Sequence, residues 1–279
     1  MAATLMDGKA LSAAVIDSLA QTVREKGLNP CLATVLVGED EASASYVRMK
    51  AAACEKIGGA FRLEKLPETA STADVIACIR ALGGDAAVNG ILLQLPLPPQ
   101  VSMGECLQAI PLAKDVDGLH PQHLAAIFAR QPGFVPATAR GVMELLSHYG
   151  VPLEGRRALV IGRSVEVGIP VAGLLLAANA TVTLAHSKTQ NLAEICRECD
   201  VVVASAGRIG LVTKEMVKPG AAVVDVGTNF VERDGKRRVV GDVDAGVAGV
   251  AAFLSPVPGG AGPMTVASLM QNLVDACSR

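Results

Sequence analysis

Tyr46 and Lys50 are two polar side chains whose spacing suits chemistry on one helix. The pattern over Ala44–Ile57 predicts a helix, and residues four apart share a helix face. A phenol and an amine are both groups that enzymes use for proton transfer. The same Tyr-x-x-x-Lys spacing occurs in short-chain dehydrogenases, but there it follows the nucleotide-binding strands, whereas here it precedes them. A half-exposed tyrosine beside a surface lysine is the alternative interpretation.

Two further segments of the first half of the chain carry polar groups next to expected strands. The apolar run Gly90–Leu93 ends in Gln94, which Leu95 and Pro96 follow, and Lys114–Gly118 contains two carboxylates. Sheets of α/β proteins bind ligands at the carboxyl ends of their strands, so an amide there is a candidate ligand contact. Each segment taken singly also fits ordinary turn chemistry.

A glycine-containing turn in the second half of the chain has the parts of a pyrophosphate site. Gly162-Arg163-Ser164-Val165-Glu166-Val167-Gly168 lies between the expected strand Ala158–Ile161 and the expected helix Gly168–Ala178. Glycine permits close backbone approach, and a helix N-terminus attracts negative charge. The spacing is not G-x-G-x-x-G, so a plain strand–helix turn is the alternative.

The next expected strand, Thr181–Leu184, points to the cofactor. An NAD site usually has an acidic residue near this strand end, which binds the ribose 2′-hydroxyl. Here His186, Ser187 and Lys188 follow instead, and hydroxyls with a cation favour the 2′-phosphate of NADP, with Arg163 as a second positive group. Glu166 would oppose this if it faced the phosphates, so NAD stays the alternative.

Strands and helices alternate along most of the chain, which predicts parallel sheets covered by helices, that is, an α/β protein. A Pro- and Gly-rich join at residues 131–136 separates two units, and Pro263–Cys277 reads as a last helix with one buried face. The expected strands are Leu32–Val37, Arg62–Leu66, Gly90–Leu93, Ala158–Ile161, Thr181–Leu184, Val201–Ala204 and Ala222–Val226. The expected helices between them are Ala44–Ile57, Thr72–Leu82, Arg140–Tyr149, Gly168–Ala178 and Leu192–Cys196.

Composition excludes several classes of protein. The 279 residues are 51% hydrophobic and 19% charged, which excludes a disordered chain. The net charge of −2 gives no basic face for nucleic acid, and no apolar run is long enough to span a membrane. No signal peptide is evident and the seven cysteines are scattered, so we expect a cytoplasmic protein. Cys196 and Cys199 lack further ligands at zinc spacing, so we expect no metal.

Taken together, these segments resemble the bifunctional methylenetetrahydrofolate dehydrogenase/methenyltetrahydrofolate cyclohydrolase family, collinearly over nearly the whole chain. The glycine-rich segment Pro256–Thr265 is similar to the family's Pro-Gly-Gly-Val-Gly-Pro-Met-Thr signature, with Ala261 in the Val position. The other matching pieces are Ser45–Lys50 with Cys54, Gly90–Pro98, Lys114–Gly118, Gly162–Ser164 with Val167, Gly168 and Pro170, His186-Ser187, Asp225–Gly227 and Gly241–Asp244.

The resemblance implies two domains that flank a cleft, the second of Rossmann type. It implies that residues 1–136 plus 262–279 bind folate, that residues 137–261 bind NADP, and that the protein is a homodimer. It assigns catalysis to Lys50, Gln94, Asp117 and Tyr46, with Tyr46 stacked on the folate and Asp117 holding the pterin. The folate-contacting residues would also include Leu93, Leu95, Pro258, Gly259, Gly260, Ala261 and Gly262. The cofactor-contacting residues would be Gly162, Arg163, Ser164, Gly168, Ser187 and Thr228.

The implied activity is oxidation of 5,10-methylenetetrahydrofolate with NADP, followed by hydrolysis of the methenyl product to 10-formyltetrahydrofolate, both steps being reversible. Tetrahydrofolate one-carbon derivatives are then the partners, with neither nucleic acid nor membrane. The chain departs from the family pattern at Glu41, Ala52, His123, Ala125, Ala137, Ala139, Val165 and Glu166. The alternatives are a dehydrogenase-only or NAD-linked member, a silent folate- or nucleotide-binding paralogue, and an unrelated amino-acid dehydrogenase with two similar domains.

Overall fold

The computed structural model describes residues 2–233 and 236–279, which form two compact α/β units. Unit 1 contains the chain up to Ser12 together with Thr138–Thr265. Unit 2 contains Ala13–Ala137 and Val266–Arg279. These bounds differ from the expected ones at the N-terminus, because the first residues join unit 1 through strand pairing. At the C-terminus the boundary falls within the last helix, four residues beyond the expected position.

Unit 2 is built on a small parallel sheet with strand order β3-β2-β4. The strands are β2 (Cys31–Val37), β3 (Ala60–Leu66) and β4 (Gly90–Leu93). Every residue of β2 is buried, as expected for a central strand with helices on both faces. Cys31, Ala33, Val35 and Val37 belong to one apolar cluster and Leu32 belongs to another, because successive residues of a strand point to opposite faces.

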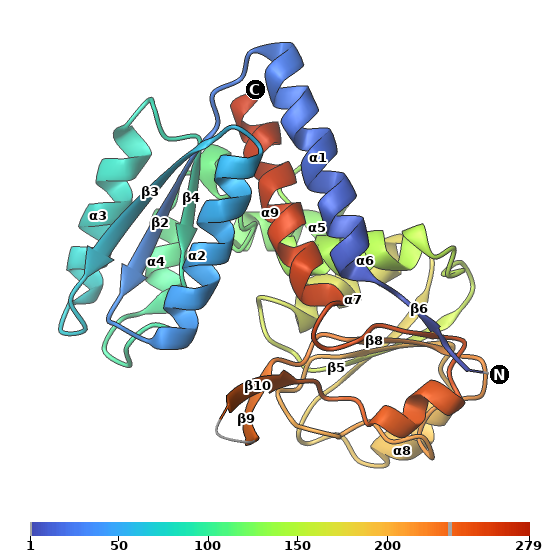
Figure 1. Ribbon diagram of the computed structural model, residues 1–279. Helices are drawn as coiled ribbons and strands as arrows, with labels where there is room; N and C mark the ends of the chain where they lie inside the picture. Colours follow the sequence, from blue (N-terminus) through green and yellow to red (C-terminus); the bar gives the residue numbers. More distant parts are fainter. Residues whose placement is uncertain (1, 234–235) are drawn as a thin grey trace. The chain divides into compact units, whose positions relative to one another are not determined.

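Helices cover both faces of the unit 2 sheet (Figure 1). The cluster on one face receives α3 (Thr72–Gly84) and α4 (Met103–Ala109). The cluster on the other face receives α2 (Glu41–Lys56) with parts of α1 (Gly8–Lys26) and α9 (Ala261–Cys277). A short 3-10 turn, η1 (Leu112–Lys114), and helix α5 (Pro121–Ala129) complete the unit.

Unit 1 contains a six-stranded parallel sheet with the order β1-β11-β8-β7-β5-β6. Chain order runs from β5 outward to β6 and then returns across β5 to β7. This reversal is the topological switch point at which open α/β sheets bind ligands. The bounds are β1 (Thr4–Leu5), β5 (Arg157–Ile161), β6 (Thr181–Ala185), β7 (Val201–Ala204), β8 (Ala222–Asp225) and β11 (Phe253–Leu254).

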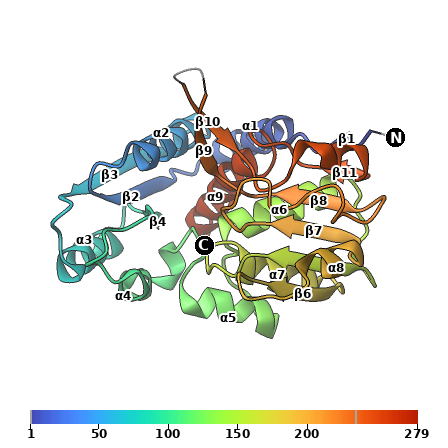
Figure 2. The ribbon, with the colours of Figure 1, turned by 90° about the horizontal axis from the view of Figure 1, so that it is seen from below.

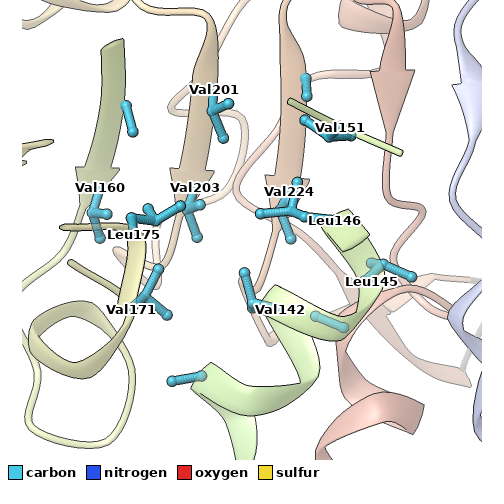
Figure 3. Close-up of a cluster of buried hydrophobic side chains, with 14 of the residues drawn as sticks. Val142, Leu145, Leu146, Val151, Val160, Val171, Leu175, Val201, Val203 and Val224 are labelled. Carbon is cyan, nitrogen blue, oxygen red and sulfur yellow. The ribbon is translucent and has the colours of Figure 1, made fainter. Parts of the chain in front are cut away.

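The unit 1 sheet also has helices on both faces. Figure 3 shows Val160, Val203 and Val224 pointing from β5, β7 and β8 toward side chains of α6 (Ala137–His148) and α7 (Gly168–Ala177). The opposite face packs against α8 (Leu192–Arg197) and the 3-10 helix η2 (Ala245–Gly249). The predicted α/β class, with a Rossmann-type second unit, is therefore confirmed.

A two-stranded antiparallel hairpin, β9 (Asn229–Arg233) and β10 (Lys236–Val240), follows β8 (Figure 2). The sequence patterns did not predict this hairpin, nor helices α1, α4 and α5 or the two-residue strands β1 and β11. No helix within residues 2–233 or 236–279 combines the length and the apolar character needed to cross a membrane.

Candidate active site

Helix α2 carries Tyr46 and Lys50 on one face, as the spacing predicted. The helix begins at Glu41 because the side chain of Asp40 accepts a hydrogen bond from the backbone N–H of Ser43 at 2.7 Å, a standard N-cap. Both Tyr46 and Lys50 are half-buried. Because α2 directly follows the buried strand β2, the sheet fixes the position of this face.

Gln94 is held at the carboxyl end of β4. Its backbone N–H donates to the Val35 carbonyl at 2.9 Å, which extends the pairing of β4 with β2 by one residue. Its side-chain Nε2 donates to the Leu95 carbonyl at 2.7 Å, so Oε1 is left to face the lysine. Lys50 Nζ then donates to Gln94 Oε1 at 3.0 Å. The structure thus brings together two candidate catalytic residues from separate segments.

The environment of Lys50 favours the uncharged amine. Burial lowers the pKa of Lys50 below its ordinary value of 10.5, and the negative charge of Asp117 partly opposes this. Gln94 is buried and supplies an acceptor without a charge, so it orients the amine without adding a negative charge beside it. A neutral amine with a fixed hydrogen-bond partner can take up a proton from a reacting group.

The loop that carries Asp117 is tightly held. Asp115 pairs with Ile91 beside β4, and its buried Oδ2 accepts the His120 backbone N–H at 2.7 Å. Burial raises the pKa of Asp115 to about 6. Gly118 has φ +71°, and a Cβ there would meet the Val135 backbone, so this turn requires glycine. Asp117 is half-buried and close enough to Lys50 to act on its charge.

His123, one of the departures from the family pattern, has a structural position in the same loop region. Its Nε2 lies 3.0 Å from the Leu112 carbonyl, and its Nδ1 accepts the Phe134 backbone N–H at 3.2 Å. These partners require a proton on Nε2 and none on Nδ1. Burial lowers the pKa of His123, which agrees with the neutral ring that these hydrogen bonds require, and the side chain fills a packing role.

The candidate nucleotide site lies in unit 1, where β5 meets α7. Gly162 has φ +122°, and a Cβ there would collide with the Ser205 carbonyl. A Cβ on Gly168 would collide with the Gly162 carbonyl, so both glycines are required by close backbone approach. The Ser164 carbonyl accepts the Ile169 N–H at 3.0 Å, while Arg163 and Ser164 are exposed. The turn presents a helix N-terminus, which suits a pyrophosphate.

The other cofactor candidates follow neighbouring strands of the same sheet. Ser187 and Lys188 are exposed directly after β6, and Thr228 is exposed after β8. The His186 N–H donates to Thr189 Oγ1 at 2.9 Å, which shapes the turn after β6. No acidic side chain occupies this turn. The residues present therefore fit a cofactor with a 2′-phosphate, because they offer hydroxyls and a cation instead of a carboxylate.

Asp225 and Asp242 are two buried acids, at the end of β8 and just after β10, and the sequence patterns assigned no role to either of them. Asp225 ends β8, and burial raises its pKa although three backbone N–H groups donate to it. Asp242 accepts three backbone N–H groups of residues 206–208. The available signal was an acid within the expected apolar strand over residues 222–226, together with the Gly-Asp-Val-Asp segment at 241–244.

The segment Pro258–Gly262 belongs to unit 1 and leads into α9. The Gly259 carbonyl accepts the Lys9 N–H at 2.9 Å, and the Gly260 N–H donates to the Pro256 carbonyl at 2.8 Å. A Cβ on Gly8 would collide with Gly260, so the start of α1 lies directly against this segment. Ala261 is buried, whereas Pro258 and Gly262 are exposed.

The cysteine pair Cys196 and Cys199 is buried at α8. Burial raises the pKa of both thiols, that of Cys196 to about 12. Both thiols are free. Within the described part of the chain, no three His, Cys, Asp or Glu side chains are grouped so that they could hold a metal ion.

A parallel sheet with a glycine turn at its switch point, together with a desolvated lysine–amide pair, defines an α/β dinucleotide-dependent enzyme. Residues 136–279 match the family described as "Tetrahydrofolate dehydrogenase/cyclohydrolase, NAD(P)-binding domain". Residues 6–117 match "Tetrahydrofolate dehydrogenase/cyclohydrolase, catalytic domain". The chain belongs to the tetrahydrofolate dehydrogenase/cyclohydrolase family, as the resemblance indicated.

Matches to individual relatives cover almost the whole chain. The chain is 48% identical over 272 residues to the bifunctional protein FolD of Methanospirillum hungatei, a match that covers 97% of this chain and 96% of the relative. The structure of the bifunctional FolD enzyme from Campylobacter jejuni is similar with a TM-score of 0.95 and 43% identity, covering 99% of each chain. The Trypanosoma brucei FolD structure, a complex with NADP cofactor and inhibitor, has a TM-score of 0.96 and 39% identity, covering 100% of this chain and 98% of that one.

Proposed function

We propose that this chain oxidises 5,10-methylenetetrahydrofolate to 5,10-methenyltetrahydrofolate with NADP and hydrolyses the product to 10-formyltetrahydrofolate, both steps being reversible. The family and its bifunctional relatives support both activities. The observation that carries the proposal is the 3.0 Å hydrogen bond from Lys50 Nζ to Gln94 Oε1, combined with a lowered pKa of Lys50.

The dehydrogenase step needs positioning more than acid–base help. The one-carbon unit bridges two nitrogens, whose lone pairs stabilise the cation that remains when a hydride leaves. NADP, when bound, supplies the hydride acceptor. In this proposal Tyr46 stacks on the folate and Asp117 holds the pterin, with Leu93 and Leu95 beside them. The segment Pro258–Gly262 also contacts the folate.

The hydrolytic step needs a base. Water attacks the methenyl carbon, and its proton must be taken up. Lys50 is the group for this role because burial disfavours its charged form, and a cationic substrate beside it disfavours that form further. Gln94 keeps the amine in place through Oε1. The lysine and the amide therefore act as a pair, with the lysine as base and the amide as its orienting partner.

The cofactor contacts are assigned to three strand ends of unit 1. Gly162, Arg163, Ser164 and Gly168 form the pyrophosphate turn after β5. Ser187 receives the 2′-phosphate after β6, with Arg163 as a second group. Thr228 contacts the cofactor after β8. Supporting this assignment, the two glycines leave no room for a Cβ, and Arg163, Ser187 and Thr228 are exposed.

A two-wavelength assay tests both activities. Absorbance is followed during turnover of 5,10-methylenetetrahydrofolate with NADP or with NAD. Reduced cofactor reports the first step, and decay of the methenyl species reports the second. We expect both signals, with NADP preferred, because the turn after β6 offers hydroxyls and a cation to the 2′-phosphate. Formation of reduced cofactor without decay of the methenyl species would instead identify a dehydrogenase-only member.

Lys50→Met tests the assignment of the base. We expect this variant to lose cyclohydrolase activity and to keep appreciable hydride transfer, because only hydrolysis needs the base. Lys56→Met is the matched control, since Lys56 lies on the same helix and forms an exposed ion pair with Asp17. Full hydrolysis by Lys50→Met would refute the assignment.

We further propose that the protein is a cytoplasmic homodimer. Among the described strands, β1 and β6 are the two outer strands of the unit 1 sheet; β6 is the longer of them, and its Leu184 is 39% exposed. An outer strand with an exposed apolar side chain is a ready site for pairing with a second copy. Light scattering of the purified protein tests the dimer. Leu184→Lys should shift it toward monomer, and cell fractionation tests the compartment.

A further inference from the structure

The carboxylate of Asp242 binds two loops of unit 1 at once. Oδ2 accepts the backbone N–H groups of Ala206 at 2.6 Å and Gly207 at 2.9 Å, and Oδ1 accepts that of Arg208 at 2.7 Å. Oδ1 also accepts Asn229 Nδ2 at 2.9 Å. The first three donors follow β7, and Asn229 follows Thr228 at the start of β9. A single buried side chain therefore fixes the chain after β7 to the chain after β8.

Asp225 holds Asp242 in place. Its Oδ1 accepts the backbone N–H of Asp242 at 2.9 Å and that of Gly227 at 2.9 Å, and its Oδ2 accepts the Val243 N–H at 3.0 Å. A Cβ on Gly241 would collide with the Asp225 carboxylate, so the Gly241 backbone lies too close to this side chain for any other residue. We name these two acids, with their hydrogen-bond partners, the carboxylate clasp.

Burying two carboxylates close together in the carboxylate clasp costs free energy. A buried carboxylate loses its hydration and must recover that free energy from hydrogen bonds. Asp242 has four such bonds and Asp225 has three, all from N–H donors. Charge-assisted bonds of this kind are short and directional, so they restrict the loops more than apolar packing would.

The loops held by the clasp adjoin the proposed cofactor site. Ser205, the residue before the clasped segment, donates its N–H to the Ile161 carbonyl at 2.8 Å and abuts Gly162 of the pyrophosphate turn. The 2′-phosphate residue, Ser187, follows β6 on the other side of β5. A dinucleotide whose adenosine half lies over β6 and whose pyrophosphate lies at β5 extends its nicotinamide half toward β7 and β8.

We propose that Asp242 is a positioning residue for hydride transfer, which holds the loops after β7 and β8 beneath the nicotinamide half of the cofactor. Asp242 does not touch the reacting atoms in this proposal. It acts through the backbone of residues 206–208 and through Asn229, the neighbour of Thr228. The inference rests on the proposed function, because it presumes NADP at these strand ends.

Asp242→Asn is the central test. The asparagine has nearly the same shape, but its amide N–H₂ group faces backbone N–H donors and cannot accept from them. We expect the dehydrogenase kcat to fall about tenfold or more, since small misplacement of reacting groups costs up to about a hundredfold. Hydrolysis of 5,10-methenyltetrahydrofolate supplied directly, without cofactor, should stay within about twofold of the wild type. The affinity for 2′,5′-ADP, which carries only the adenosine half, should also be unchanged.

Two further variants keep the test decisive. Asp244→Asn is the matched control, because Asp244 is exposed and caps η2 through the Gly246 N–H at 2.8 Å without touching the clasped loops. It should leave both activities unchanged. Asn229→Ala removes one of the four bonds to Asp242 and should lower the dehydrogenase kcat below that of the wild type while hydrolysis is kept, so it tests the inference even where Asp242→Asn does not fold.

The outcomes separate this inference from the proposed function. Wild-type protein without either activity would overturn the proposed function. Wild-type activity together with equal losses of hydride transfer, hydrolysis and 2′,5′-ADP affinity in both Asp242→Asn and Asn229→Ala would show a merely structural role. Unchanged hydride transfer in folded Asp242→Asn would also overturn the inference.

Discussion

Burial disfavours the charged form of the Lys50 amine and so lowers its pKa. Burial is the dominant influence on its pKa, and the charge of Asp117 works in the opposite direction. A single substitution at Asp117 removes the effect of its charge on the pKa of Lys50. The effect of burial cannot be removed in this way, because it depends on the whole contact between the helix and the sheet. The lysine is therefore the residue whose titration reports most directly on the site.

The pH dependence of hydrolysis should follow this lysine. A base must be unprotonated, so cyclohydrolase activity should rise with pH through the pKa of Lys50, with a midpoint below 10.5. In Asp117→Asn the charge that raises this pKa is gone, so the midpoint should move to lower pH while the KM for folate rises. Rates measured from pH 6 to 10 test this. A midpoint that moves upward in the variant would contradict the role of Asp117.

At the scale of elements, the turn between β5 and α7 depends on two glycines that lie against backbone. Gly162→Ala adds a Cβ where the Ser205 carbonyl lies, and φ +122° is itself unfavourable for alanine. We expect the variant to lose about tenfold or more in NADP affinity, because the turn must move away from the helix N-terminus.

Fluorescence titration with NADP measures that loss for Gly162→Ala. Gly220→Ala is the control, because Gly220 also has a positive φ but has no atom near its would-be Cβ. Gly220→Ala therefore has the same kind of backbone strain as Gly162→Ala, but its new Cβ does not collide with another atom. Equal NADP affinity in Gly162→Ala and the wild type would show that the turn does not bind the pyrophosphate.

Elements that depend on local pattern could be predicted from the sequence. Strands β4 and β7 agree with the expected ranges, and the other predicted strands differ from theirs by one or two residues at an end. The strands β1 and β11 could not be predicted, because two residues carry no periodicity and their parallel pairing joins distant segments. The hairpin β9–β10 is rich in charge, and Arg237 over the Phe230 ring at 3.9 Å is a contact that no alternation pattern reveals.

Part of the candidate site could likewise be predicted from the sequence, and part could not. Lys50 and Gln94 lie 44 residues apart in sequence. Lys50 is on the helix that follows β2, and Gln94 follows β4, which pairs with β2. Both residues could therefore be expected at the carboxyl ends of neighbouring parallel strands, where α/β sheets bind ligands. Asp242 acts through backbone N–H groups at residues 206–208, and the identity of those residues does not reveal the bond. The clasp could therefore be found only once the loops were placed.

At the scale of the whole molecule, the lowered pKa of Lys50 reduces the stability of the fold below pH 10.5. An unfolded chain holds a proton on Lys50 up to pH 10.5, whereas the folded chain releases it at lower pH. The unfolded state therefore binds more protons in this interval, so the free energy of unfolding rises with pH toward 10.5. This is a cost of catalysis that the rest of the molecule must offset.

Lys50→Met removes that cost. We expect the variant to be more stable than the wild type at pH 7, and we expect the difference to shrink as the pH approaches 10.5. Urea unfolding at pH 7, 8 and 9 measures both effects. Lys56→Met provides the comparison, because an exposed ion pair contributes at most about 1 kcal/mol. A Lys50→Met variant that is less stable at pH 7 would contradict the expectation that burial of this lysine lowers the stability of the fold.

The order of strands in unit 1 has a consequence for protein engineering. The residues that would read the 2′-phosphate follow β6, whereas the clasp follows β7 and β8, with β5 between them. Choice of cofactor and geometry of hydride transfer are thus assigned to different loops on different strands. An acidic residue introduced at Ser187 should change the preferred cofactor from NADP to NAD and leave the turnover of the bound cofactor nearly unchanged. The cofactor preference of this fold could therefore be changed by substitutions in one turn.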